Sequence, residues 1–187
     1  RVGQFCFCRD VTIERTFEHQ IWISANTDAL TGLYNRRFFY EYMNENRKEN
    51  QLSLLYVDLD DFKKVNDAHG HHIGDGALEL VARLMREAFP GDFIVRLGGD
   101  EFLICLVGER SLAFLEEKAN RLLQSLLEAF QVSDYLRVMS ASIGIASSAD
   151  PGTKLDDLVR QSDIAMYAAK QSGKSRCCVY SSGLIKK

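Results

Sequence analysis

Two apolar runs separated by a short polar bend form the clearest pattern in the chain. Residues 93–97 and 102–107 are mostly apolar, and the bend between them is Gly98-Gly99-Asp100-Glu101. Because glycine adopts positive φ angles without steric cost, this pattern predicts a β-hairpin. The two adjacent acids form a compact negative site, of the kind that a hard cation such as Mg²⁺ prefers. A charged, solvated hairpin tip is the alternative interpretation.

The rest of the chain shows helical and strand-like periodicity in turn. Apolar residues at intervals of three and four predict a short helix after residue 61 and longer helices at residues 35–48, 75–89, 112–130 and 155–170. Further strands are predicted at residues 1–10, 52–59, 136–146 and 176–180. Residues 66–75, which contain two glycines and three histidines, are expected to form a loop.

Two local features add expectations about packing. A helix is expected at residues 12–27, either as a connector packed on the domain or as a dimeric coiled linker, because its apolar stripe is only about two heptads long. Trp22 and Ile23 lie off that stripe and are expected to dock onto the following domain. Residues 140, 142 and 144 are small and share one face of their strand, which indicates close packing of a helix or a ligand.

The order of these elements predicts the fold class. The core order β-α-α-β-β-α-β fits an α+β sandwich with antiparallel central strands. In such a sheet the end of the strand at 52–59 and the turn of the hairpin are neighbours. We therefore expect Asp58 to lie beside Asp100, although the two are far apart in the sequence.

Composition excludes several classes of protein. With 46% apolar residues the 187-residue chain can bury a core, and its net charge of −3 gives no general attraction to nucleic acid or anionic membranes. No apolar run approaches the ~20 residues that span a bilayer. The five cysteines lack metal-ligand spacing and indicate reduced thiols in a cytoplasmic domain. The chain starts without Met, so we expect a piece of a longer protein, with any membrane anchor upstream.

Asp58 is the most informative acid outside the hairpin. It lies between Val57 and Leu59 inside an apolar run, where a carboxylate is costly unless it is paired or bound to a metal. Capping of the next helix accounts for Asp60 or Asp61 but not for Asp58. Two carboxylates at adjacent strand ends can hold two divalent ions, which together stabilise the attacking and leaving oxygens of a phosphoryl displacement. The histidines at 69, 71 and 72 lack the spacing of a zinc site.

Candidate groups for binding phosphate and a base accompany these acids. The helix start near Lys63 offers free N–H groups to an anion, and Lys170 and Lys174 add cations, although a solvated surface charge is the alternative for each lysine. Asn66 and Asp75 offer an amide and a carboxylate, and a carboxylate can accept hydrogen bonds from guanine but not from the N1 position of adenine. Both are otherwise explained as turn and N-cap residues.

The segment Arg96–Phe102, RLGGDEF, resembles the signature of the GGDEF family, the diguanylate cyclases, and other motifs of that family recur in order from Asp28 to Lys174. The resemblance implies a ferredoxin-like, palm-type antiparallel β-sheet flanked by helices, as in nucleotidyl cyclases. It implies that Asp28 and the pair Arg36-Arg37 tie the linker to the domain. It also implies two Mg²⁺ or Mn²⁺ ions at each GTP site. The residue roles that it implies are catalysis by Asp100 and Glu101, metal binding by Asp58, the Leu59 backbone carbonyl and Asp100, and GTP binding by Phe62, Lys63, Asn66, His71, Asp75, Gly99, Lys170 and Lys174.

The implied reaction condenses two GTP molecules into cyclic di-GMP and two pyrophosphates across an antiparallel homodimer. The implied domains are the last strand of an upstream PAS-like sensory domain at residues 1–11, a signalling linker at 12–27 and the catalytic domain at 28–187. A non-catalytic GTP-binding module that controls a partner domain is the alternative. A polymerase-like nucleotidyltransferase is disfavoured, because the net charge of −3 leaves no basic groove for nucleic acid.

Two departures from the family pattern carry their own expectations. Lys174 stands where the family usually has arginine, so we expect weaker binding of the triphosphate, because lysine lacks the guanidinium fork. Many members also have an inhibitory RxxD motif shortly before the hairpin. Here Asp92 is present but Phe89 replaces the arginine, so we expect this inhibitory site to be degenerate.

Overall fold

The computed structural model describes residues 12–46, 51–148 and 153–185. The strand predicted at residues 1–10, and with it the assignment to an upstream PAS-like domain, lies outside these ranges. The elements in chain order are α1 Thr12–Asn26, β1 Tyr34–Asn35, α2 Arg36–Asn46, β2 Leu52–Asp60, α3 Phe62–His69, α4 His71–Ala88, β3 Phe93–Gly98, β4 Glu101–Val107, α5 Leu112–Gln131, β5 Ser140–Ser147, α6 Leu155–Gln171, β6 Arg176–Val179 and the 3-10 helix Ser182–Ile185.

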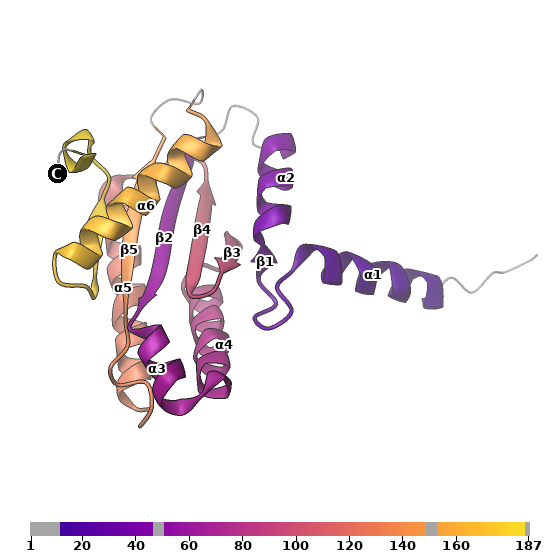
Figure 1. The fold of residues 1–187 in the computed structure, drawn as a ribbon. Coiled ribbons are helices and arrows are strands. Elements are labelled where there is room, and N and C mark those ends of the chain that lie inside the picture. The colour runs from indigo at the N-terminus through magenta and orange to yellow at the C-terminus, as the bar shows by residue number, and fades with distance from the viewer. Residues whose placement is uncertain (1–11, 47–50, 149–152, 186–187) are drawn as a thin grey trace, which may run out of the picture.

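The strands form one mixed sheet in the order β1-β3-β4-β2-β5-β6 (Figure 1). The inner pairs β3–β4, β4–β2 and β2–β5 are antiparallel, and the edge strands β1 and β6 join in parallel. This arrangement confirms the predicted α+β class with antiparallel central strands. The short β1 was not predicted, because two residues carry no periodicity.

Helices cover both faces of the sheet. Helices α4 and α5 lie on one face, and α6 and α2 lie on the other (Figure 1). The central strand β2 is consequently buried along its whole length, which explains its nearly continuous apolar sequence. Its last residues, Asp58 to Asp60, reach the edge of the core where α3 begins.

The small residues of β5 accommodate a helix. A Cβ atom placed on Gly144 would lie 1.9 Å from the carbonyl oxygen of Ser162 and 2.1 Å from the backbone nitrogen of Met166, both in α6. The backbone of α6 therefore rests directly on β5. Of the two expectations for this face, close packing of a helix is confirmed at Gly144.

Three predicted boundaries were wrong. Helix α3 continues to His69 although residues 66–75 were predicted to form a loop, and helix α4 begins at His71 instead of residue 75. Gly70, with φ of 86°, is the single residue that separates the two helices. Strand β5 begins at Ser140 instead of residue 136. Residues 132–138 form turns in which Leu136 is buried while Val138 is exposed, although the two would share one face of a strand. The other predicted ends agree to within a residue or two, as is usual for such assignments.

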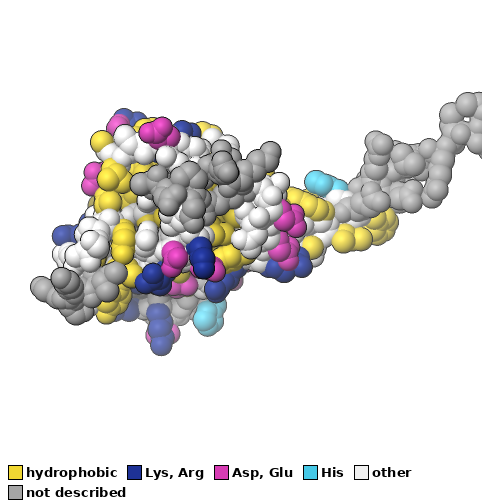
Figure 2. Space-filling view, turned by 90° about the horizontal axis from the view of Figure 1, so that it is seen from above, with side chains coloured by type: hydrophobic (Ala, Val, Ile, Leu, Met, Phe, Trp, Pro, Cys, Tyr) yellow, Lys and Arg dark blue, Asp and Glu magenta, His cyan; other side chains and the backbone are white. Residues whose placement is uncertain are grey.

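Helix α1 projects from the rounded body of the domain (Figure 2). Phe17 and Ile21 are exposed, and Trp22 makes an edge-to-face contact with Phe38 of α2 at a ring-centroid distance of 5.4 Å. The predicted docking of Trp22 is therefore confirmed, while the choice between a connector and a dimeric linker stays a prediction. In the described ranges, the helices are all too short or too polar to cross a membrane.

Candidate active site

The fold brings the two predicted acidic positions together. Asp58 is paired across the β2–β4 ladder with Glu101, and the backbone N–H of Leu59 donates to the Asp100 carbonyl oxygen at 3.2 Å. The turn that carries Asp100 is made by Gly98 and Gly99, whose φ angles are 148° and 55°. The predicted contact between the end of β2 and the hairpin turn is confirmed.

Asp58 lies in an environment that disfavours its charge. It is 7% exposed, and burial, helped by Asp100 and Glu101, raises its pKa to about 6 although Lys170 opposes the shift. The Nζ atom of Lys170 lies 2.6 Å from Asp58 Oδ1. That oxygen still has no aligned hydrogen bond among the described residues. A buried carboxylate of this kind is stabilised by a cation, and Lys170 provides it here.

The donor set at this edge suits a divalent metal. A carboxylate oxygen of Asp58 without an aligned hydrogen bond and the carboxylate of Asp100 are hard oxygen donors, which Mg²⁺ and Mn²⁺ favour. No cluster of three or more His, Cys, Asp or Glu side chains that could hold a metal occurs in the described part of the chain. The residues therefore fit an ion held by one or two carboxylates together with substrate phosphates and water, and do not form a complete protein cage.

The prediction that Asp60 or Asp61 caps α3 was wrong. Asp61 occupies the N-cap position with φ of 60° and makes no capping hydrogen bond. Its carboxylate instead pairs with Lys64 at 2.8 Å and with Lys174 at 2.9 Å, which lowers its pKa. Asp60 accepts hydrogen bonds from Ser140 and from other groups away from α3. The start of α3 is consequently left without a side-chain acceptor from either acid.

The lysines proposed for phosphate binding lie at the same edge. Lys170, near the end of α6, contacts Asp58, and Lys174, just beyond α6, contacts Asp61. Burial alone would lower the pKa of Lys170, but its pairing with Asp58 outweighs burial and raises the pKa. Lys63 in the first turn of α3 is exposed, while Phe62 is buried. Both later lysines are therefore ion-paired with acids and are not free surface charges.

The predicted base-reading residues surround the junction of α3 and α4. Asn66 Oδ1 is buried, lies against Gly74 of α4 and has no hydrogen-bond partner among the described residues. His71 and Asp75 are exposed and one helical turn apart on α4. Asp75 lies inside the helix, so the alternative that it is an N-cap residue was wrong.

Two residues at this site were missed by sequence reasoning. The hydroxyl of Tyr56 hydrogen-bonds to Glu101, and burial is the main cause of the raised pKa of the tyrosine. The alternation of β2 could have revealed Tyr56, because it precedes Asp58 by two positions and shares its face. Arg96 donates to the Gly99 carbonyl oxygen at 2.8 Å and to Asp28 Oδ1 at 3.0 Å. Arg96 thus connects the hairpin turn to the end of the linker.

The tie between linker and domain is confirmed in part. Asp28 pairs with Arg96, and Arg37 donates to the carbonyl oxygen of Ala25 at 2.6 Å. Arg36 lies over the ring of Tyr40 in its own helix, and its expected role stays a prediction.

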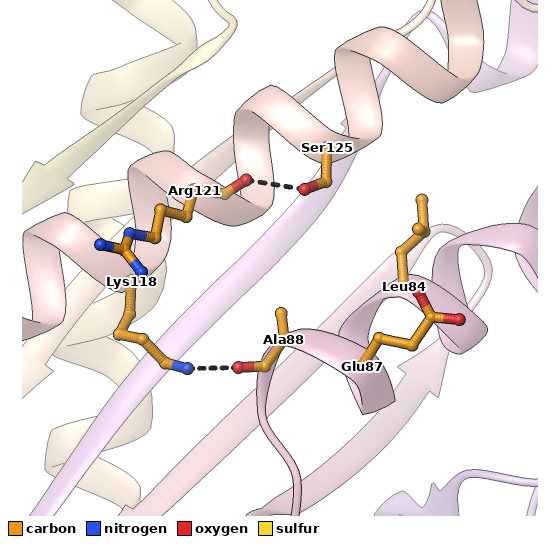
Figure 3. Close-up of a pocket in the computed structure, with 6 residues that line it drawn as sticks. All are labelled: Leu84, Glu87, Ala88, Lys118, Arg121 and Ser125. Atoms are coloured by element: carbon orange, nitrogen blue, oxygen red, sulfur yellow. Dashed lines mark hydrogen bonds between the residues drawn. The ribbon is translucent and has the colours of Figure 1, made fainter.

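The window at residues 89–92 differs from a phosphate-binding site. Phe89 is 1% exposed and belongs to the core. Lys118 of α5 lies over its ring at 4.8 Å and donates a hydrogen bond to the Ala88 carbonyl oxygen at the end of α4 (Figure 3). Asp92 is half-buried, and burial raises its pKa. The side chain at 89 is therefore directed into the core, where it cannot contact a dissolved ligand.

We expect cyclic di-GMP not to bind tightly at this window. Phe89 offers neither charge nor hydrogen bonds, and the nearby Lys118 is engaged with the end of α4. Isothermal titration of cyclic di-GMP into the protein and into Asp92→Ala measures this. Micromolar or tighter binding that is lost in the Asp92 variant would contradict the expectation.

Comparison with known proteins gives a consistent family. The sequence model described as "Diguanylate cyclase, GGDEF domain" matches residues 25–176. The chain is 37% identical to the cyclic di-GMP phosphodiesterase PdeR of Escherichia coli, covering 94% of this chain and 27% of PdeR. It is 33% identical to the diguanylate cyclase DgcM of Escherichia coli, covering 91% of this chain and 42% of DgcM. The chain thus spans less than half the length of both relatives.

The solved structures include a similar fold with a bound nucleotide. The coiled coil and GGDEF domain of DgcB from Caulobacter crescentus, in complex with c-di-GMP, has a TM-score of 0.79 at 28% identity. The match covers 89% of this chain and 93% of that chain.

Proposed function

Because the chain belongs to the GGDEF domain family, we propose that it is a diguanylate cyclase, which condenses two GTP molecules into cyclic di-GMP and two pyrophosphates. The observation that carries this proposal is the position of Asp58 beside the Asp100–Glu101 turn, with a buried carboxylate oxygen that lacks an aligned hydrogen bond. The acids and the amide expected of such an enzyme are all present in the sequence, whereas Lys174 replaces the usual arginine.

The proposed roles follow from where each group lies. Asp58, Asp100 and the Leu59 backbone carbonyl would hold Mg²⁺ or Mn²⁺ together with the phosphates. When bound, the metal neutralises charge on the attacking and leaving oxygens. The hydroxyl of Tyr56, hydrogen-bonded to Glu101, would help to orient that carboxylate beside these groups.

Nucleotide binding would use the two ends of α3. The phosphates would lie at its start, near Phe62, Lys63 and the backbone of Gly99. The terminal phosphates would then replace the present acidic partners of Lys170 and Lys174, which are Asp58 and Asp61. At its other end, Asn66, His71 and Asp75 would surround the guanine. The carboxylate of Asp75 would accept hydrogen bonds from the guanine edge, which favours GTP over ATP.

Catalysis would require two copies of the chain. In the proposed reaction each domain holds one GTP, and the 3′-hydroxyl of one nucleotide attacks the α-phosphorus of the other. The two sites must therefore face each other in an antiparallel homodimer. Helix α1, linked to the hairpin turn through Asp28 and Arg96, would let an upstream sensory domain control how the sites meet.

A non-catalytic regulatory module is the second candidate. The 37% identity to PdeR, a protein named as a phosphodiesterase and only 27% covered by this chain, favours it. Such a module would bind GTP without converting it, whereas a cyclase would make cyclic di-GMP.

Incubation with GTP and Mg²⁺, followed by mass analysis of the products, tests the proposal. The protein should be assayed at high concentration and also fused to a dimerising domain, so that a monomeric state does not hide activity. Cyclic di-GMP is the expected product. GTP binding without any product from the fused dimer would favour the regulatory module instead.

Gly74→Ala is expected to weaken GTP binding about tenfold or more with little loss of stability. The new methyl group would lie 1.9 Å from Asn66 Oδ1 and 3.1 Å from Phe62 Cζ, so the amide, which is the flexible end of a side chain, must leave its place while the phenyl ring shifts only slightly. A lost hydrogen bond to a base edge accounts for roughly this factor. Calorimetric titration with GTP and thermal unfolding measure the two effects.

Gly76→Ala in the same helix is the matched control. A Cβ atom there meets nothing within 4 Å, so GTP binding should stay unchanged. Equal GTP affinity in the Gly74 and Gly76 variants would argue against Asn66 as a base-reading residue.

A further inference from the structure

Asp60 is a buried acid to which the proposed reaction assigns no role. It is the last residue of β2 and is 1% exposed. Ser140 donates to its Oδ2 at 2.7 Å, and Ser142 donates to Oδ1 at 2.9 Å and to Oδ2 at 3.1 Å. The backbone N–H of Ser175 donates to Oδ2 at 3.3 Å. These donors compensate for the cost of burying the carboxylate.

The contact with Ser175 fixes an unusual turn. Helix α6 ends in a Schellman motif, in which the N–H of Gly173 donates to the Lys170 carbonyl oxygen and the N–H of Lys174 donates to the Ala169 carbonyl oxygen. Gly173, Lys174 and Ser175 then have φ angles of 113°, 60° and 50°. A left-handed conformation costs non-glycine residues free energy, so this turn persists only because surrounding contacts hold it.

The turn determines where the ammonium group of Lys174 lies. Its Nζ atom is 2.9 Å from Asp61 Oδ2, at the start of α3 where the phosphates would bind. Asp60 and Asp61 thus hold the same turn by two different attachments. Asp60 binds the backbone next to Lys174, and Asp61 pairs with the side chain of Lys174 itself.

We propose that Asp60 is a positioning residue for substrate binding. By holding the backbone of Ser175 against the end of β2, it keeps the left-handed turn in place. Lys174 then remains at the triphosphate site after a substrate has drawn its side chain away from Asp61. This inference rests on the proposed function, since it assumes that Lys174 binds the triphosphate of GTP.

The proposal explains how a lysine can serve at this position. Lysine is a flexible point charge without the directional fork of arginine, so its placement depends on the backbone that carries it. The hydrogen bond from the Ser175 backbone to the buried carboxyl group of Asp60 supplies that fixed backbone.

Calorimetric titrations with two nucleotides in the presence of Mg²⁺ test the proposal. One is a GTP analogue with a methylene bridge between the α and β phosphorus atoms, which carries three phosphates but cannot release pyrophosphate. The other is GMP, which has no terminal phosphates. Asp60→Ala is expected to weaken binding of the analogue about tenfold and to leave GMP binding unchanged.

Further variants separate positioning from a general structural role. Ser140→Ala removes one hydrogen bond to Asp60 but leaves the contact with Ser175, so it should lower the melting temperature without selective loss of analogue binding. In a Lys174→Ala background, Asp60→Ala should weaken analogue binding no further. Asp60→Asn keeps the shape and should give a smaller loss of the same kind, which provides the measurement if the alanine variant does not fold.

The outcomes distinguish this inference from the proposed function. The role of Asp60 would be overturned if Asp60→Ala or Asp60→Asn weakened the binding of the analogue and of GMP equally. It would also be overturned if Asp60→Ala and Lys174→Ala reduced analogue binding additively. Neither result would affect GTP binding or product formation by the unaltered protein. Failure of the unaltered protein to bind the analogue would overturn the proposed function and this inference together.

Discussion

Replacing Asp100 with alanine is expected to reduce the formation of cyclic di-GMP roughly 1,000-fold or more. The carboxylate lies at the turn that faces Asp58, and the proposed metal would lose one of its two protein carboxylates. Metal stabilisation of a phosphoryl transition state amounts to several kcal/mol, and each ~1.4 kcal/mol corresponds to a tenfold change in rate. Product formation is measured by mass analysis with GTP and Mg²⁺ under the conditions used for the unaltered protein.

The fold should survive this substitution. Asp100 is half-exposed in a glycine turn, and the hydrogen bond that it makes to Leu59 uses its backbone carbonyl, which alanine retains. Glu79→Ala removes an exposed acid from the middle of α4 and is the matched control for a loss of negative charge. Cyclase activity in Asp100→Ala comparable to that of Glu79→Ala would show that Asp100 has no part in the chemistry.

Replacing Gly144 with alanine is expected to lower the free energy of unfolding by about 3 kcal/mol or more. The added methyl group would lie 1.9 Å from the Ser162 carbonyl oxygen and 2.8 Å from the Met166 Cα atom. These are backbone atoms of α6 and cannot rotate away as a side chain could, so the whole helix must shift. Overpacking of a core commonly costs ~1–3 kcal/mol, and a helix pushed off its sheet lies at or beyond the upper end of that range.

Urea denaturation followed by circular dichroism measures this loss. Gly76→Ala, at an open position of α4, should be neutral or stabilising by about 1 kcal/mol, because alanine favours helix more than glycine does. Because α6 also carries Lys170, a folded Gly144→Ala protein should bind GTP more weakly. A stability within experimental error of that of the unaltered protein would contradict the direct contact between α6 and β5.

The sequence predicted the structure best for elements whose conformation depends on a single short segment of the chain. The Gly-Gly bend produced the predicted hairpin, and the apolar period of α5 produced a helix within one residue of its expected bounds. The disagreements arise where local signals conflict. The histidines and glycines of residues 66–75 indicated a loop, but only Gly70 interrupts two helices that pack together.

The sequence predicted which residues belong to the candidate site better than it predicted their ion-pair and hydrogen-bond partners. The sequence placed Asp58 near Asp100 because the strand order follows from the order of the elements. It could not show that Lys170 contacts Asp58, since that contact depends on how far the end of α6 reaches along β2. Asp60 shows the same limit. Its position just before α3 in the sequence suggested a helix cap, but its hydrogen-bond donors come from β5 and from the turn after α6.

By itself, the sequence determined the types and order of the longer elements, the bend with its two acids and the resemblance to a family. These depend on periodicity, on the φ preferences of glycine and on motifs, all of which act over short stretches of chain. Only the tertiary structure decided which charges meet, namely Lys170 with Asp58, Lys174 with Asp61 and Arg96 with Asp28. Each pair joins segments brought together by sheet register and helix packing, and burial at those contacts sets the pKa of Asp58.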